Sequence, residues 1–214
     1  MQKFEHVLPS EIEKRSFEII TQELGEDQPD PVTAPVVKRV IHASADFDYA
    51  KNLCFSEDVI PKSLAALKAG ALVITDTRMA WSGINKKVLE SLGGEALCFM
   101  ADEDVALEAK ASGTTRAQAA MVKAARLHAQ NPERPMIFAV GNAPTALIAL
   151  DELIRAGKLS PALVIGVPVG FVNVVFAKEL ILDLPVPSIV ARGRKGGSNI
   201  AAAIVNALLY MIHR

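Results

Sequence analysis

Short apolar runs alternate with helical patterns along most of the chain, and this alternation limits the possible folds more than any other feature. The apolar runs lie at residues 53–55, 71–75, 96–99, 136–140, 162–165 and 188–191. The helical patterns lie at residues 62–68, 85–92, 115–130, 145–155, 172–180 and 198–213. Such alternation is typical of βαβ units, and runs without polar alternation indicate strands buried on both faces. We therefore predict an α/β fold with a mainly parallel sheet and helices on both faces.

Two further helices are expected ahead of the first strand. Ser10 and Glu13 have the S-x-x-E spacing of a capping box, and Gly25 is a typical helix terminator. A second helix is predicted over residues 35–43, because Pro35 suits the first turn of a helix.

The size and composition of the chain favour one globular domain over residues 1–214. The formal net charge is −1, so no overall basic field points to nucleic acid or to an acidic membrane. The apolar run at residues 200–212 is shorter than the roughly 20 residues of a transmembrane helix. Cys54 and Cys98 are interpreted as buried free thiols. No signal-peptide pattern opens the sequence, so a cytoplasmic protein is expected.

Polar and flexible residues follow four of the predicted strands, at residues 76–79, 141–145, 166–170 and 192–198. In α/β sheets the ligand crevice lies beyond the carboxyl ends of the strands. The 192–198 segment, R-G-R-K-G-G-S, places Arg192, Arg194 and Lys195 ahead of a helix. It can hold carboxylates or phosphates, since its glycines permit close approach and the helix start is electropositive; it can equally be a solvated turn. The sequence has neither a Walker A motif nor G-x-G-x-x-G at the first strand, which argues against P-loop NTPases and Rossmann dehydrogenases.

Several single residues admit both a functional and a structural interpretation. Asn142 can bind a ligand or belong to a tight turn, and Asp76 can orient a catalytic group or cap a helix. Arg116 can clamp a carboxylate or lie on the surface of a helix's first turn. His42 ends an amphipathic run and, by pattern alone, is a packed or capping histidine. No metal-ligand cluster and no Ser/His/Asp arrangement is found.

Six segments together carry a resemblance to a known family. They are Ile12 with Ser16-Phe17, R-V-I-H-A at 39–43, T-R-A at 115–117, G-N-A-P-T-A-L at 141–147, G-V-P-V-G-F-V at 166–172 and R-G-R-K-G-G-S at 192–198. In this order they resemble precorrin-8X methylmutase and its cobalt-precorrin-8 counterpart. The resemblance implies a flavodoxin-like sheet, a homodimer with a corrinoid tetrapyrrole site at the subunit interface, and no added cofactor or metal. By motif match His42 is the catalytic histidine, and Ser16 and Arg116 lie near the substrate.

The implied reaction moves a methyl group from carbon 11 to carbon 12 of precorrin-8X or cobalt-precorrin-8, giving hydrogenobyrinate or cobyrinate. The substrate has no leaving group, so the chemistry needs a proton donor such as a protonated imidazole, not a nucleophile. Arg116, Arg192, Arg194 and Lys195, with Asn142, are the candidates for the peripheral carboxylates. One departure from the family pattern is visible: bulky Phe176, and Ala177 in place of a serine before Lys178.

Two alternatives stay open. One is a non-catalytic tetrapyrrole carrier on the same fold. The other is a binding module for a phosphorylated ligand, held by Arg194, Lys195 and Gly196. The sequence leaves open whether the substrate contains cobalt. Direct protonation of a ring nitrogen by His42 is harder when a metal already coordinates the ring.

Overall fold

The structure is a computed structural model that describes residues 6–213. Within these residues six strands form a sheet in the order β1-β6-β5-β4-β2-β3. They are β1 (Leu53–Phe55), β2 (Leu72–Thr75), β3 (Glu95–Leu97), β4 (Met136–Val140), β5 (Leu163–Gly166) and β6 (Ser188–Ala191). Strands β2 to β6 are parallel, and β1 pairs antiparallel with β6 at one edge. The order of the parallel strands is the flavodoxin-like one, so the predicted fold class is confirmed.

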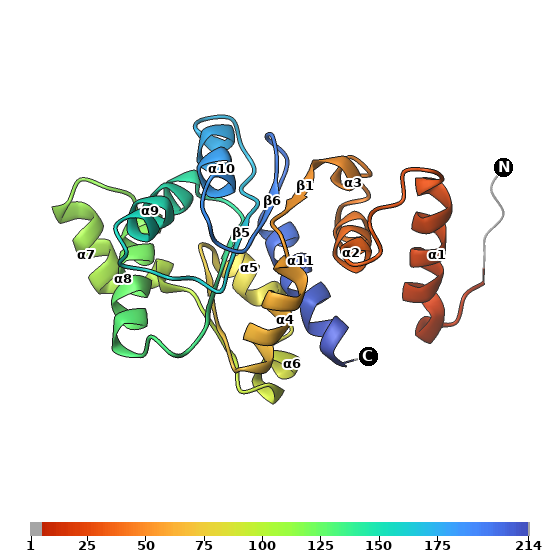
Figure 1. Ribbon diagram of the computed structural model, residues 1–214, viewed down its shortest axis with the longest axis horizontal. Coiled ribbons are helices and arrows are strands. Elements are labelled where there is room, and N and C mark those ends of the chain that lie inside the picture. Colours follow the sequence, from red (N-terminus) through yellow and green to blue (C-terminus); the bar gives the residue numbers. More distant parts are fainter. Residues whose placement is uncertain (1–5, 214) are drawn as a thin grey trace.

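Successive residues of the central strands point to opposite faces, and helices cover both (Figure 1). One face packs against α2 (Ala34–Ser44), α4 (Val59–Lys68), α6 (Lys86–Ser91) and α11 (Ser198–His213). The other packs against α7 (Glu103–Ala111), α8 (Arg116–Gln130), α9 (Pro144–Arg155) and α10 (Val174–Leu182). β2, β4, β5 and β6 are buried throughout, as their unbroken apolar runs predict.

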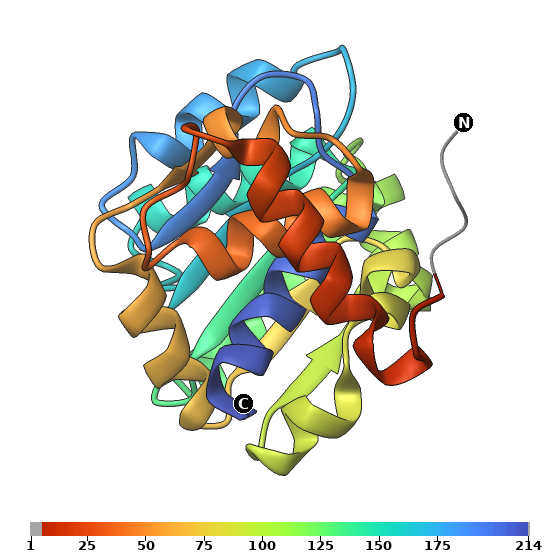
Figure 2. The same cartoon turned by 90° about the vertical axis from the view of Figure 1, so that its right-hand side faces the viewer.

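The first helix, α1 (Ile12–Leu24), is the outermost layer and lies across α2 (Figure 2). Its predicted capping box is wrong. A short 3-10 turn, η1 (Pro9–Glu11), leads into the helix, and no side chain caps it. Glu13 pairs instead with Arg39 on α2. The predicted end is confirmed, because Gly25 has a φ of 52° and stops the helix there.

Besides η1, three helices and a second 3-10 turn were not predicted: α3 (Tyr49–Asn52), α5 (Arg78–Gly83), α7 and η2 (Phe99–Ala101). Helix α10 begins two residues later than predicted, because Asn173 adopts a left-handed conformation with φ 59°. The predicted burial of the thiols is also wrong, since Cys54 and Cys98 are free but only half-buried.

The apolar C-terminal helix α11 lies in the core of the chain. It packs against α2, α4 and α5, and most of its residues are buried. No partner subunit is needed to cover this helix, so its apolar character is no argument for a dimer.

Candidate functional site

The loops that follow β4, β5 and β6 are stacked against one another at the carboxyl edge of the sheet. The amide of Gly197 donates to Val167 O at 2.8 Å, and the amide of Gly170 donates to Arg194 O at 3.2 Å. A Cβ on Gly196 would lie 2.1 Å from Val167 O, and one on Gly141 would lie 2.6 Å from Ser198 Cα. These two glycines therefore allow neighbouring loops to pack closely against each other. The sequence instead predicts that the glycines allow a ligand to approach the main chain.

Two of the three cations of the 192–198 loop already have carboxylate partners. Arg192 donates to both oxygens of Glu179 at 2.9 Å. Lys195 donates to Asp46 at 2.7 Å and to Asp48 at 2.6 Å, and these bonds hold the pKa of Lys195 above its ordinary value. Arg194 is exposed and lies over the ring of Phe171, 5.3 Å from its centroid, with no ion pair among the described residues. Arg194 is thus the loop's available cation.

His42 lies in the last turn of α2 with an exposed side chain. Its ring stacks on Phe17 of α1, with 5.5 Å between centroids and 16° between planes. The guanidinium of Arg39 lies 4.8 Å from the centroid of the same Phe17 ring. One face of the imidazole is therefore fixed by packing, while the side chain remains open to a ligand.

Arg39 was not predicted as part of the site, although it anchors the helix that supports His42. It binds Glu13 through two hydrogen bonds of 2.9 and 3.2 Å, and its side chain is 12% exposed. It also lies 5.1 Å from the centroid of the Tyr210 ring on α11. Ser16 lies beside Phe17 on α1, and its hydroxyl donates to Ile12 O at 2.8 Å.

A groove of about 1090 Å³ is lined by residues of α1, α2 and α11. Its lining includes Glu13, Phe17, Thr21, Lys38, Arg39 and Tyr210. None of the seven predicted site residues lines it. Phe17 belongs both to this groove and to the stack with His42, so the groove lies next to the candidate catalytic side chain.

Arg116 is the first residue of α8 and Asn142 lies in the 141–145 loop, and both residues are exposed. Thr115, directly before Arg116, caps α8, and its hydroxyl pairs with that of Thr145 at 2.8 Å. The structure therefore places the start of α8 beside the 141–145 loop, but shows no contact between the two predicted ligand-binding side chains.

Asp76 is buried and organises the 141–145 loop. Its carboxylate accepts the amides of Gly141, Asn142 and Ala143 at 2.9, 2.8 and 2.7 Å. Burial raises the pKa of Asp76, and the three amides offset only part of this effect. These contacts lie where the strand order reverses, between β2 and β4. Asp76 therefore has a structural role, but not that of a helix cap, since Thr77 caps α5 (Arg78–Gly83).

Lys178 is fully buried on α10, and sequence reasoning assigned it no role. Its ammonium donates to Gly193 O at 2.8 Å and to Lys195 O at 2.7 Å. Burial lowers the pKa of Lys178 to about 8. A lysine within the apolar run V-V-F-A-K-E-L-I-L was the signal that could have identified it.

Next to the 192–198 loop lies a patch of exposed apolar side chains from the end of β5 and the start of α10, here called the β5–α10 patch. Its members are Val169, Phe171, Val172, Val175 and Phe176, with exposed fractions of 49%, 80%, 77%, 41% and 60%. An apolar surface of this kind, bordered by Arg194, is typical of a binding surface.

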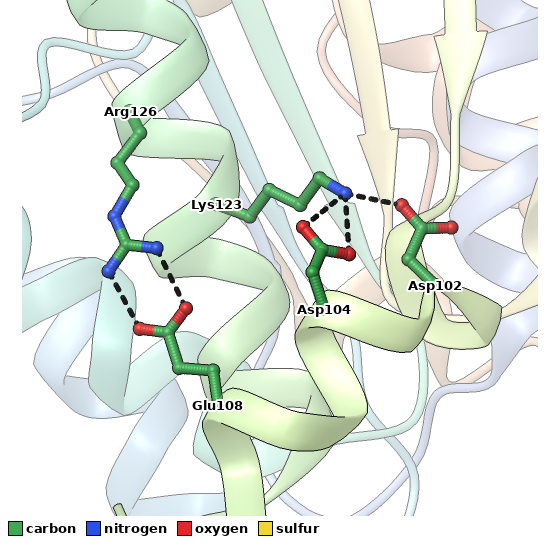
Figure 3. Close-up of polar contacts among 5 residues, drawn as sticks. All are labelled: Asp102, Asp104, Glu108, Lys123 and Arg126. Carbon is green, nitrogen blue, oxygen red and sulfur yellow. Dashed lines mark hydrogen bonds and ion pairs between the residues drawn. The ribbon is translucent and has the colours of Figure 1, made fainter. Parts of the chain in front are cut away.

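A second charged cluster, on α7 and α8, carries no site (Figure 3). Lys123 binds Asp102 and Asp104 at 2.7 and 2.8 Å, and Arg126 binds Glu108 through two hydrogen bonds of 2.7 Å. All five charges are satisfied, so the cluster ties α7 to α8. Over residues 6–213, no group of three or more His, Cys, Asp or Glu side chains is placed to hold a metal ion. No helix in the same range has the length and apolar character needed to cross a membrane.

The sequence and the fold are similar to those of known proteins. Residues 11–211 match the family model described as precorrin-8X methylmutase. The chain is 45% identical over 205 residues to the cobalt-precorrin-8 methylmutase of Priestia megaterium, covering 94% of this chain and 88% of that one. The Salmonella typhimurium protein of the same name is 44% identical over 207 residues, with 94% and 95% covered. A crystal structure of precorrin-8x methyl mutase from Thermus thermophilus has a TM-score of 0.83 and 41% identity, covering 95% and 98%.

Proposed function

The chain belongs to the precorrin-8X methylmutase family, and from this premise we propose that it moves a methyl group from carbon 11 to carbon 12 of a corrinoid tetrapyrrole in cobalamin biosynthesis. The observation that carries the proposal is the family match over residues 11–211, which contains His42 and every strand-end loop. The same span supports a single methylmutase domain over the whole chain. A phosphate-binding module is not favoured. The ammonium of Lys195 already binds Asp46 and Asp48, and Gly196 packs against the main chain of Val167.

His42 is the proposed catalytic acid. The methyl shift is an isomerisation without a leaving group, so it is accelerated by withdrawing electron density from the conjugated ring. A positioned imidazole can carry a proton near neutral pH and release it again. The stack on Phe17 orients the His42 ring, and the exposure of the side chain leaves it open to the substrate. Ser16, Arg116 and Asn142 are proposed as further substrate contacts, on the strength of the motif match.

Cobalt-precorrin-8 is the substrate we propose, giving cobyrinate, because the curated relatives at 44% and 45% identity carry that name. With the ring nitrogens coordinated by cobalt, we propose that His42 donates its proton to the conjugated carbon framework, not to a ring nitrogen, and recovers it after the methyl shift. The test mixes the purified protein separately with cobalt-containing and cobalt-free precorrin-8 and follows the visible spectrum. Turnover of the cobalt-containing compound supports the proposal. Binding without a product spectrum indicates a carrier, and turnover of the cobalt-free compound alone contradicts the choice of substrate.

Arg194→Ala is expected to weaken tetrapyrrole binding and to reduce its salt dependence. Arg194 has no carboxylate partner among the described residues, so its charge is available to a substrate carboxylate. Arg192→Ala is the matched control, because Glu179 already neutralises Arg192. Fluorescence or absorbance titrations at low and high salt measure both variants. Equal affinity of Arg194→Ala and the parent at every salt concentration contradicts a role in binding.

We propose that the protein is a homodimer and that the β5–α10 patch lies at the interface, where the site would be shared. The support is the size of the exposed apolar surface next to Arg194. Sedimentation at micromolar concentration should show a dimer for the parent and a monomer for Phe176→Asp. Leu107→Asp on α7, an equally exposed apolar position, should remain dimeric. A monomeric parent contradicts the proposal.

A further inference from the structure

Lys178 lies fully buried on α10 (0% exposed), and the proposed chemistry does not use it. Its two observed hydrogen bonds go to main-chain carbonyls of the 192–198 loop, Gly193 O and Lys195 O. No described carboxylate pairs with the ammonium, and burial lowers the pKa of Lys178 to about 8. Burying a cation in this way is costly, so a lysine here is a poor means of stabilising the fold. The two hydrogen bonds of Lys178 instead fix the positions of two main-chain carbonyls of the 192–198 loop.

The outer side of the same loop is tied to the end of α2. The Lys195 ammonium binds Asp46 and Asp48 at 2.7 and 2.6 Å. Asp46 is itself fixed, since its other oxygen accepts the amide of Asp48 at 3.0 Å. These aspartates directly follow the helix whose last turn bears His42. The loop is therefore held on one side by α10 and holds the end of α2 on the other.

We propose that Lys178 is a positioning residue for the methyl shift. By holding the carbonyls of Gly193 and Lys195 it sets the 192–198 loop, and through Lys195 the loop sets the end of α2 that carries His42. This inference rests on the proposed function. A displacement of about 1 Å in a catalytic group can reduce the rate by about 100-fold, so the effect is expected mainly in kcat.

The main test is Lys178→Met, which keeps the unbranched apolar stem and removes the donors. We expect kcat to fall by about 10- to 100-fold, with a smaller change in tetrapyrrole affinity. In the substrate-free protein, the amides of residues 193–197 should exchange with deuterium faster than in the parent. A merely structural lysine would change the melting temperature and leave kcat of the folded enzyme unaltered. An unchanged kcat in folded Lys178→Met overturns the proposal.

The second test breaks the link on its outer side. In Asp46→Asn/Asp48→Asn the shapes are kept and the charges are lost, and both positions lie at the surface. We expect kcat to fall here too, and the triple variant to lose less than the product of the two separate losses, because both changes act through one loop. If the losses in kcat multiply in the triple variant, or if kcat is unchanged in Asp46→Asn/Asp48→Asn, the proposal is overturned. If Lys178→Met does not fold, the kcat of Asp46→Asn/Asp48→Asn alone decides the question. Turnover by the parent tests the proposed function separately.

Discussion

His42→Ala is expected to lose turnover by about 100-fold or more while still binding the tetrapyrrole, because a positioned general acid contributes roughly 10²- to 10⁴-fold. The exposed imidazole stacks on Phe17, and the two hydrogen bonds between Arg39 and Glu13 continue to join α1 to α2 when the imidazole is removed. Affinity should persist, because the proposed substrate contacts of Arg116, Asn142 and Arg194 do not depend on His42. His42→Asn should fail similarly, since an amide donates a hydrogen bond but does not release a proton.

The measurement is the absorbance change under single-turnover conditions, with binding titrated separately for each variant. His213→Ala is the matched control. His213 is also an exposed histidine at the end of a helix, and its imidazole contacts Ser91, which belongs to none of the site motifs. Its turnover should equal that of the parent. If His42→Ala folds, binds and turns over at the parent rate, His42 is a packed helix-end residue and the catalytic assignment is wrong.

Gly196→Ala is expected to destabilise the protein by about 3 kcal/mol and to abolish turnover, because overpacking costs about 1–3 kcal/mol and the overlap here is with main-chain atoms. The added methyl would lie 2.1 Å from Val167 O and 2.8 Å from Pro168 O. Both atoms are main-chain, and Val167 O also accepts the amide of Gly197. The 166–170 and 192–198 loops must therefore separate.

Thermal unfolding measures the effect. About 2–4 °C per kcal/mol is typical for a domain of this size, so the melting temperature should fall by roughly 10 °C. Gly166→Ala, at the last residue of β5, is the control. Its methyl would meet Val190 Cγ2 at 3.4 Å, an ordinary contact, and the melting temperature should change little. A Gly196→Ala protein that melts with the parent shows that the loops are not packed as described.

Sequence periodicity located the strands and the long helices well, because burial on both faces requires unbroken apolar runs and amphipathic helices. Strands β1, β4 and β6 and helix α11 begin and end as predicted. Helices α5 and α7 were missed for physical reasons. α5 has six residues, too few to show a helical period, and α7 buries only Val105 and Ala109. The capping box failed because Glu13 has a stronger partner in Arg39, a residue that local spacing does not indicate.

By itself, the sequence determined the fold class, the family and the identity of the strand-end loops, because these depend on residue types and their order. Only the tertiary structure decided which contacts the candidate site residues make. In the structure, carboxylates pair with Arg192 and Lys195, whereas Arg194 stays available. Asp76 binds the amides of the 141–145 loop, and Lys178 binds carbonyls of the 192–198 loop. Each of these contacts joins residues from different elements of the fold. Lys195 and Asp46 lie 149 positions apart in the chain, and no local pattern specifies a contact between residues so distant.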